Sequence, residues 1–367
     1  MKNIESYHVV ALFSGGLDSI VAAKLMQEQG HSVLCLHFCT PFFGKPEKID
    51  HWQKIYGLTI RAVDVGDEFV NMLVRRPVHG FGSVLNPCVD CKVLMMRHAR
   101  RIMDEVGACC IVSGEVIGQR PMSQRRETLN IIARDGGVED RLLRPLCAKH
   151  LAPTLAEREG LVDRERMLDL FGRGRKGQMA LAEHFKLKEI PTPAGGCRLA
   201  EQENARSYWP LLHHIPHPTA KDFHLTAKGR QLWSAGEHPL WLTIGRKMQD
   251  NDDILALAGA DDLLFKTANF PGPVGLGRVA GQEWTEEAIA SAAAVVASYA
   301  NKAVEHHKTT GEAVAVRVHA GSLDAPGRMV EVAPQRVSPY GWGEKNWEST
   351  KASIKEEAKA LREGESA

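Results

Sequence analysis

Short apolar runs alternate with amphipathic stretches over the first half of the chain. The runs have the length of buried strands and lie at 9–13, 32–38, 58–65, 109–113 and 142–146. Helical patterns at 45–56 and 91–106, and one that ends at Gly30, separate them. Strands that alternate with helices are typical of a doubly wound parallel sheet, which binds ligands where its strands end. We therefore expect an α/β domain over 1–205.

The pattern changes after residue 205. A segment rich in His and Pro predicts a linker over 206–239, and a smaller α+β domain follows over 240–340. Its predicted strands are short, and an Ala-rich helix is expected at 285–301. The strands are expected at 242–246, 253–257, 262–265, 274–279, 314–318 and 329–332. Residues 341–367 form a charged tail that predicts a frayed helix.

Composition adds limits on partners and location. The chain has 367 residues, with 44% hydrophobic and 25% charged residues, which is ordinary for soluble globular proteins. No apolar run approaches the roughly 20 residues that span a bilayer, and no signal peptide is visible, so we expect a cytoplasmic protein without a membrane partner. Residues 1–238 carry 32 basic and 27 acidic side chains (+5), whereas 239–340 carry 9 and 12 (−3). A polyanion should therefore prefer the first part.

The loop after the first strand has the features of a phosphate-binding site. It reads Ser14-Gly15-Gly16-Leu17-Asp18-Ser19 and runs into a helix. A strand, a Gly-Gly turn and a helix direct backbone N–H groups at an anion, and the two serines add hydroxyl donors. Asp18 suits such a site if Mg²⁺ bridges it to the phosphates. The alternative is a tight turn with a serine at the helix start.

The motif S-G-G-x-D-S resembles the PP-loop of the N-type ATP pyrophosphatases. That resemblance implies cleavage of ATP between the α- and β-phosphates, leaving an adenylated substrate. The segment 113–124 is similar to the one that follows the fourth strand in 4-thiouridine synthetases of the ThiI type. It implies that Gly114 and Gln119 help to cover the nucleotide. The predicted cofactors are ATP and Mg²⁺, with Asp18 also counted among the catalytic residues.

Three cysteines lie in loop settings rather than in strand cores. Cys88 and Cys91 form a C-x-x-C pair at a predicted helix start, and Cys197 follows a Pro- and Gly-rich loop. A thiol at a helix N-terminus has a lowered pKa and is a better nucleophile and metal ligand. The pair could equally be half of a structural zinc site, but no second C-x-x-C follows.

The sequence N-P-x-x-x-C, followed by a distant Gly-x-Cys, resembles tRNA 2-thiouridylases of the MnmA type. The resemblance implies that Cys91 and Cys197 hand sulfur to an adenylated uracil. Those enzymes have an acidic residue where this chain has Cys88, which makes it similar to PP-loop thiolases that hold an iron–sulfur cluster. Cys88, Cys91 and Cys197 are therefore predicted as catalytic residues and as ligands of a [4Fe–4S] cluster. Plain persulfide and disulfide chemistry is the open alternative.

The second domain resembles the RNA-binding domain of NFACT proteins. The residues that carry this resemblance are Gly245-Arg246, Asp261-Asp262-Leu263, Phe265 and Pro271-Gly272. We therefore predict ATP-dependent thiolation of tRNA or another RNA, with sulfide or a cysteine desulfurase as the sulfur donor. A PP-loop sulfurtransferase for a small molecule or a metal centre, and a non-catalytic RNA-binding factor, are the alternatives. The basic segment 172–177 is either part of an RNA path or a solvated surface. The sequence leaves the oligomeric state open.

Overall fold

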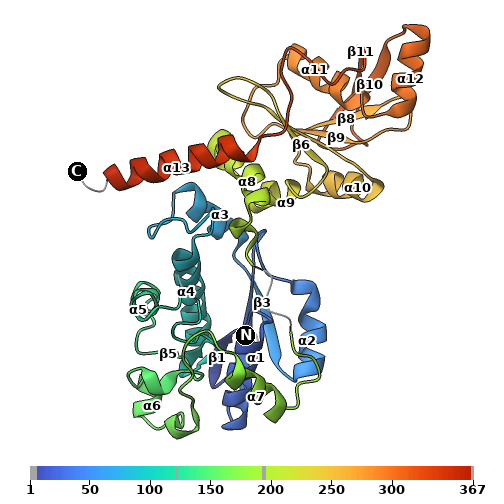
Figure 1. The fold of residues 1–367 in the computed structure, drawn as a ribbon. Helices are drawn as coiled ribbons and strands as arrows, with labels where there is room; N and C mark the ends of the chain where they lie inside the picture. Colours follow the sequence, from blue (N-terminus) through green and yellow to red (C-terminus); the bar gives the residue numbers. More distant parts are fainter. Residues whose placement is uncertain (1–5, 121–122, 192–195, 365–367) are drawn as a thin grey trace. The chain divides into compact units, whose positions relative to one another are not determined.

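The computed structural model describes residues 6–120, 123–191 and 196–364 (Figure 1). The chain divides into two compact units, residues 1–201 and 202–367. The break lies close to the boundary at 205 that the sequence predicts. Each unit has its own sheet and its own apolar core, so each is described by itself.

The first unit is built on a five-stranded parallel sheet of order β3-β2-β1-β4-β5. The central strand β1 (Val9–Leu12) pairs with β2 (Val33–Cys39) on one side and β4 (Cys110–Val112) on the other. The edge strands are β3 (Thr59–Asp64) and β5 (Leu142–Leu143). The predicted doubly wound α/β sheet is confirmed. Because all five strands run in one direction, the loops that leave β1 and β4 are neighbours at the same edge.

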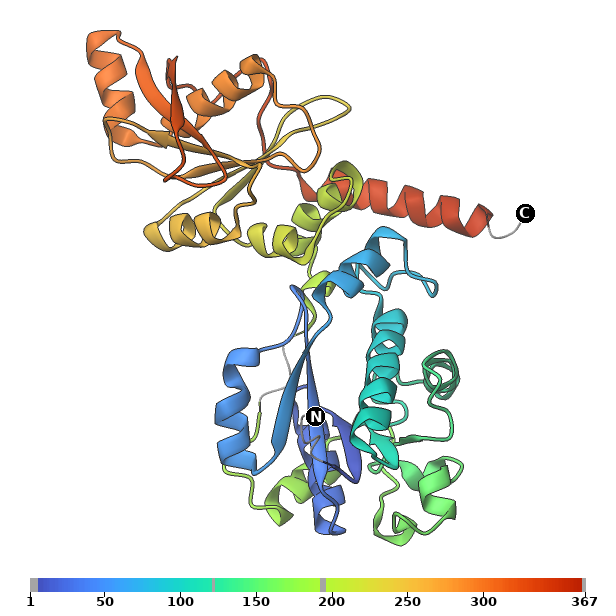
Figure 2. The same cartoon turned by 180° about the vertical axis from the view of Figure 1, so that it is seen from behind.

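Helices cover both faces of this sheet because alternate residues of each strand point to opposite sides. Val9 and Ala11 join the core that contains α1 (Leu17–Glu28), and Val10 joins the core that contains α4 (Cys88–Val106). Figures 1 and 2 show α4 on one side of the sheet and α2 on the other. The unit also contains α2 (Ile49–Tyr56), α3 (Gly66–Val74), α5 (Arg126–Asp135), α6 (Leu155–Arg158) and α7 (Lys176–His184). Its short 3-10 helices are η1 (Pro46–Lys48), η2 (Ala148–His150), η3 (Arg164–Arg166) and η4 (Arg198–Ala200).

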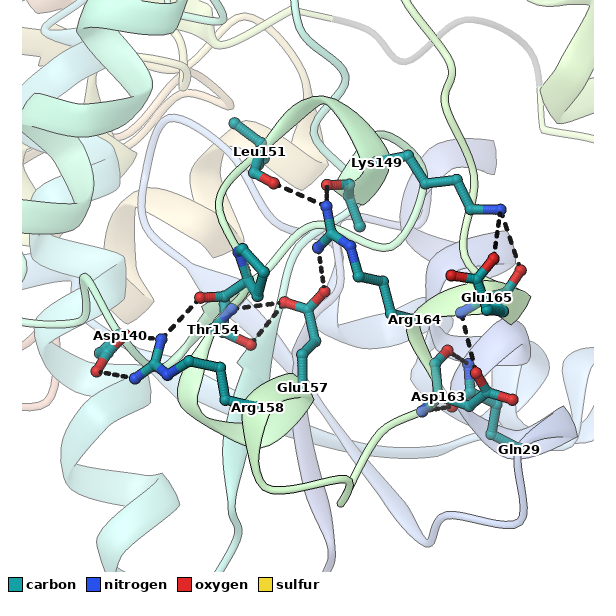
Figure 3. Close-up of polar contacts among 12 residues, drawn as sticks. Gln29, Asp140, Lys149, Leu151, Thr154, Glu157, Arg158, Asp163, Arg164 and Glu165 are labelled. Carbon is teal, nitrogen blue, oxygen red and sulfur yellow. Dashed lines mark hydrogen bonds and ion pairs between the residues drawn. The ribbon is translucent and has the colours of Figure 1, made fainter.

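Side chains rather than strands fix the irregular segment after β5 (Figure 3). Thr154 and Glu157 form a capping box at the start of α6. Glu157, whose side chain is nearly fully buried, also pairs with Arg164. The Arg164 guanidinium donates to the carbonyl oxygens of Ala148 (2.9 Å) and Leu151 (2.8 Å). Buried polar groups that are fully paired hold one conformation, so this segment keeps a defined shape without pairing as a strand.

The second unit contains a six-stranded antiparallel sheet of order β11-β10-β8-β9-β7-β6. Its apolar face packs against α11 (Glu286–Ala297), whose alanines allow a close approach. This is the smaller α+β unit that the sequence predicts, and the structure shows that its strands are antiparallel. The strands are β6 (Arg230–Trp233), β7 (Trp241–Ile244), β8 (Leu263–Thr267), β9 (Gly275–Arg278), β10 (Val314–Ala320) and β11 (Gly327–Val332).

Two stretches of this unit differ from the predicted pattern. The predicted strand at 253–257 is wrong, because these residues end the helix α10 (Met248–Leu257). A short apolar run does not separate strand from helix, and here the Asp250 carboxylate accepts from the Arg246 backbone N–H (3.1 Å) at the helix start. The predicted linker at 206–239 contains most of α8 (Gln202–His214), all of α9 (Ala220–Leu225) and β6.

The charged tail is also more ordered than the sequence predicts. It forms α13 (Trp347–Gly364), which packs against α8. The Trp209 indole N–H donates to Ser353 Oγ over 3.0 Å, and His213 Nε2 lies 2.7 Å from Glu357 Oε2. The unit also contains α12 (Asn301–Thr310). Within the described ranges, no helix combines the length and the apolar character that crossing a membrane requires.

Candidate active site

The loop between β1 and α1 is closed by its two serines. Ser19 Oγ donates to the Gly16 carbonyl oxygen over 2.8 Å and accepts from the Ser14 N–H over 3.3 Å. Ser14 Oγ in turn accepts from the Gly16 N–H over 3.3 Å. These bonds hold the loop over the first turn of α1, where backbone N–H groups and the helix dipole favour an anion. The predicted phosphate loop therefore has a defined shape.

Gly15 is needed at its position for two reasons. Its φ of +76° is one that residues with a Cβ rarely adopt. A Cβ there would also lie 2.6 Å from Cζ2 of the Trp52 side chain on α2. The loop thus packs directly on the buried Trp52 ring, and this contact fixes the position of the loop backbone.

A buried histidine that sequence reasoning missed supports the same loop. His37 Nε2 accepts from the Lys45 N–H over 2.8 Å, so Nδ1 carries the proton and donates to the Phe13 carbonyl oxygen over 3.0 Å. Burial lowers the pKa of His37, which favours this neutral form. Its position inside an apolar strand gave no sign of this contact, because the partners lie elsewhere in the sequence.

The loop after β4 lies against the first turn of α1. A Cβ at Gly114 would lie 2.4 Å from the Asp18 carbonyl oxygen, so only glycine allows this approach. Further along the same loop, Gln119 Nε2 donates to Asp18 Oδ2 over 3.0 Å. Gly114 and Gln119, both predicted for the nucleotide site, are thus brought to Asp18.

A chain of amides extends from Asp18 to α7. Gln119 Oε1 accepts from Gln178 Nε2 over 3.4 Å, and Gln178 is fully buried. Two buried oxygens of this chain, Asp18 Oδ1 and Gln178 Oε1, have no hydrogen-bond partner among the described residues. An unpaired buried acceptor is costly, and a cation or donor supplied by a ligand would satisfy it. Asp18 Oδ1 is therefore suited to a hard cation such as Mg²⁺.

Glu115, beside Gly114, is the most strongly bound carboxylate of the site. It pairs with Lys92 on α4 and, over 3.0 Å, with Arg144 after β5, and it accepts from Ser113 Oγ over 3.1 Å. Burial would raise the pKa of Glu115, but Lys92 and Arg144 outweigh burial and lower it to about 2. Sequence reasoning missed this triad of Glu115, Lys92 and Arg144. The acidic residue beside Gly114 at a strand end was the only local sign of it.

Two of the three predicted cysteines lie in the first turn of α4. The Asn86 side-chain N–H donates to Cys88 Sγ over 3.1 Å. The buried Asp90 carboxylate accepts from the backbone N–H groups of Val78 (2.9 Å) and His79 (3.0 Å). These contacts fold the preceding loop back onto the start of α4 and fix where the two thiols lie.

Backbone hydrogen bonds bring the segment of Cys197 to the loop before that pair, although it is more than one hundred positions away. The backbone on either side of it is held by bonds from the Leu85 N–H to Leu199 (3.0 Å) and from the Arg198 N–H to Phe42 (3.0 Å). Burial raises the pKa of Cys91 far above its usual value, and Cys197 and Cys88 raise it further. Burial also raises the pKa of Cys197 to about 11, with a further contribution from Cys88. The three thiols are therefore close enough to interact electrostatically, and we refer to Cys88, Cys91 and Cys197 as the thiol cluster.

The thiol cluster and the phosphate loop are joined by continuous contacts. Lys92 follows Cys91 on α4 and pairs with Glu115, which is adjacent to Gly114 and so to Asp18. Across the residues that the structure describes, no set of three or more His, Cys, Asp or Glu side chains is arranged to hold a single metal ion. The three predicted cysteines thus interact electrostatically, but among the described residues they are not arranged as the ligands of one ion.

Comparison with known proteins finds a likeness to one family within the first unit. Residues 5–151 match the family model described as thiamine biosynthesis protein (ThiI). This segment, which is less than half of the chain, is similar to the ThiI family. It contains the phosphate loop, the loop after β4, Cys88 and Cys91. Cys197, α7 and the second unit lie outside the match, so the likeness of residues 240–340 to NFACT domains stays a prediction.

Relatives with curated names point the same way. A probable tRNA sulfurtransferase from Thermococcus kodakarensis is 35% identical over 133 residues, which is 34% of each chain. One from Methanothermobacter thermautotrophicus is 33% identical over 168 residues, 42% of this chain and 41% of that one. The chain therefore spans well under half of the length of these relatives. Among solved structures, the U34-tRNA thiolase NcsA from Methanococcus maripaludis, with its [4Fe–4S] cluster, is 16% identical with a TM-score of 0.28, covering 60% of this chain and 71% of that one.

Proposed function

We propose that this protein is an ATP-dependent sulfurtransferase that thiolates uridine in tRNA. The observation that carries the proposal is the unbroken contact from the phosphate loop, through Glu115 and Lys92, to the thiol cluster. A nucleotide site and a sulfur site within one unit suit a reaction in which ATP activates a base for attack by sulfur. The names of the relatives that match the first unit support the same class of reaction.

ATP would bind with its phosphates on the loop that contains Ser14, Gly15, Gly16 and Ser19. Asp18 Oδ1 would hold Mg²⁺, which would supply positive charge to the phosphates. The N-terminus of α1 and the hydroxyl groups would then stabilise the negative charge that develops on the leaving pyrophosphate. Gln119 would orient the Asp18 carboxylate through its hydrogen bond to Oδ2.

The first chemical step would activate the base. The uracil carbonyl oxygen attacks the α-phosphorus of ATP, the bond to the β-phosphate oxygen breaks, and pyrophosphate leaves. Adenylation is required because a carbonyl oxygen is a poor leaving group. In the second step, sulfur attacks the uracil carbon that carries the adenylated oxygen, and AMP departs with that oxygen. The target base must be unstacked to reach the loop.

In the persulfide route, Cys91 and Cys197 would both take part in sulfur delivery. One of them carries an extra sulfur received from a cysteine desulfurase, and that outer sulfur attacks the activated carbon. The other thiolate then attacks the inner sulfur, which frees the thiocarbonyl and leaves a disulfide. A cellular thiol reduces this disulfide for the next turnover.

The same residues fit an iron–sulfur cluster. The raised pKa values of Cys91 and Cys197 disfavour bare thiolates, and bound iron would compensate their charge. Cys88, Cys91 and Cys197 would hold a [4Fe–4S] cluster, and the Asn86 amide would donate to the Cys88 sulfur. Such a cluster would supply an iron without a protein ligand, which can bind inorganic sulfide as the sulfur donor.

Release of pyrophosphate tests the assignment. The full chain, Mg²⁺, ATP, sulfide and bulk tRNA should yield AMP and pyrophosphate in a tRNA-dependent manner, with thiouridine detected by mass spectrometry of digested tRNA. Asp18→Ala should abolish both products. Release of ADP and phosphate, or turnover that ignores tRNA, would refute the proposal in favour of another phosphoryl transfer or a small-molecule acceptor. Iron analysis and the absorbance near 400 nm of anaerobically purified protein separate the two sulfur routes.

The second unit would position the RNA, as its resemblance to NFACT domains implies, without taking part in the chemistry. The protein would act in the cytoplasm, where tRNA and reduced thiols occur together.

A further inference from the structure

Next to the nucleotide loops lies a surface that combines cations with an exposed aromatic ring. We call it the basic platform and define it as Phe171, Arg125, Arg173, Arg175 and Lys176. Phe171 is 66% exposed, which is unusual for a large apolar side chain. The cations come from the start of α5 and from the turn that leads into α7. The cations of the platform thus come from two parts of the chain.

Backbone contacts hold the platform beside Asp18. The Gly172 N–H donates to the Ile117 carbonyl oxygen over 2.8 Å. A Cβ at Gly118 would lie 3.7 Å from Cζ of Phe171. The next residue, Gln119, donates to Asp18. The exposed ring is therefore adjacent to the loop that reaches the nucleotide site.

A histidine joins the ring to the start of α5. The rings of His150 and Phe171 make an edge contact with centroids 5.8 Å apart. His150 Nε2 lies 2.6 Å from the Asp169 carbonyl oxygen, and the Arg126 guanidinium donates to the His150 carbonyl oxygen over 3.0 Å. Phe171 is thus connected through His150 to Arg126 at the start of α5, while most of its side chain stays exposed. Arg125 directly precedes Arg126 in the sequence.

The cations of the platform differ from those of the adjoining segment. In Figure 3, Arg158 pairs with Asp140 and Arg164 pairs with Glu157. The structure gives the side chains of Arg125, Arg173 and Lys176 no ion pair or hydrogen bond with any described residue, and all three are exposed. Arg175 is half-buried, and its buried Nε has no partner within the described residues.

The nearest acidic side chains in sequence do not neutralise these cations. Glu127 and Asp169 are exposed, and no ion pair joins either of them to a described basic side chain. A platform whose four cations pair with no described carboxylate suits a polyanion. The aromatic ring favours one class of polyanion, an unpaired nucleic-acid strand. Such strands bind through bases stacked on aromatic rings and through phosphates held by Arg and Lys.

We propose that the basic platform holds an unpaired stretch of the substrate RNA, with one base stacked on Phe171 and the neighbouring phosphates on Arg125, Arg173 and Lys176. This inference deepens the proposed function and rests on it for the identity of the RNA. Because the platform borders the loop that contains Gln119, a strand bound there would have its adjacent base near the activated phosphate. Cys197 and most of the platform lie beyond the 5–151 match, so residues after 151 would supply part of both the strand-binding surface and the thiol cluster.

Direct binding tests this inference independently of catalysis. The full chain is titrated into a fluorescently labelled, unpaired 12-nucleotide RNA and into bulk tRNA at several salt concentrations. Phe171→Ala should weaken binding by roughly five- to hundredfold without changing the salt dependence, whereas Phe171→Trp should retain affinity. Arg173→Ala with Lys176→Ala should lower the slope of log K against log salt by about 0.7 for each lost phosphate contact. Circular dichroism and thermal melting establish that each variant is folded.

Arg158→Ala is the matched control, because it removes an exposed but paired cation of the adjoining segment and should leave RNA affinity unchanged. Wild-type affinity in the Phe171 and Arg173/Lys176 variants would overturn the inference. So would equal losses in the Arg158 variant, which would indicate non-specific charge. Binding of the platform to an acidic protein instead of RNA would also overturn it. Failure of the proposed function would show separately, as RNA binding without release of pyrophosphate.

Discussion

Gln119 Nε2 donates to Asp18 Oδ2 over 3.0 Å, although 101 positions separate the two residues in the chain. This bond occupies one carboxylate oxygen of Asp18 and leaves the other, Oδ1, buried and without a partner among the described residues. The carboxylate is thus held in one orientation with a single open position. A magnesium site that is oriented in advance needs less rearrangement when the nucleotide arrives.

Gln119→Ala should raise the Mg²⁺ concentration needed for half-maximal pyrophosphate release and slow the reaction by roughly tenfold. A hydrogen bond to a charged group contributes about 1.5–3 kcal/mol, and its loss lets the carboxylate rotate. The measurement is pyrophosphate release against Mg²⁺ concentration at saturating ATP. Gln27→Ala is the control, because Gln27 donates to the Gly57 carbonyl oxygen toward the far end of α1. An unchanged Mg²⁺ dependence in Gln119→Ala would contradict this role.

Glu115 should make the stability of the first unit sensitive to acid. Burial raises its pKa, but Lys92 and Arg144 more than reverse this and lower the pKa to about 2, below the ordinary value near 4.5. A depressed pKa stabilises the fold above the unfolded value, and this stabilisation is lost as the pH falls from about 5 to about 2. The contribution is roughly 3 kcal/mol in the free energy of unfolding.

The test of this acid sensitivity is urea denaturation of Glu115→Gln and of the unmodified chain between pH 2 and pH 7. Glu115→Gln should be less stable by about 3–5 kcal/mol at pH 7, since Lys92 and Arg144 lose their shared partner. Its stability should fall less steeply with acid. Glu105→Gln, which removes an exposed pair with Arg61, should behave like the unmodified chain. Parallel pH curves for all three proteins would count against the Glu115 triad.

Cys109 should react with alkylating agents before Cys91 or Cys197. The hydrogen bond between the Cys109 and Cys110 sulfurs, 3.8 Å apart, is the main cause that lowers the pKa of Cys109 to about 7. Burial raises the pKa of Cys197 to about 11. In iron-free protein at pH 7.5, iodoacetamide should label Cys109 first, and labelling of Cys197 should accelerate as the pH approaches 11. Peptide mass spectrometry over time measures both rates, and Cys109→Ser should remove the fast reaction. Equal rates at pH 7.5 would be the contrary result.

Cys91→Ser and Cys197→Ser should separate the two chemical steps. Each variant should lose thiouridine formation by at least about a hundredfold, because sulfur delivery needs the thiol itself. Release of pyrophosphate should fall much less, since the phosphate loop is unchanged. Cys109→Ser is the matched control: it lies immediately before β4, at the sheet edge away from the loops, and should keep both activities. Equal loss of both products in the Cys91 and Cys197 variants would indicate a structural role for these thiols.

The alternation of apolar runs and helical patterns was enough to predict the parallel sheet, because a strand buried on both faces is a continuous apolar run. The short run at 253–257 gave the wrong element, since five residues fit a strand or a helix equally well, and in the structure they form the end of α10. Residues 206–239 contain β6, whose pairing with β7 is a contact across a loop that composition does not encode.

For the site, local sequence was informative wherever neighbouring residues make the feature. The phosphate loop and the C-x-x-C pair are of this kind, because a turn and a helix start depend on a few consecutive residues. The pairing of Gln119 with Asp18, the Glu115 triad and the approach of Cys197 to Cys91 were decided only by the tertiary structure. Each joins segments whose distance is set by strand order and helix packing, and no pattern within one segment carries that information.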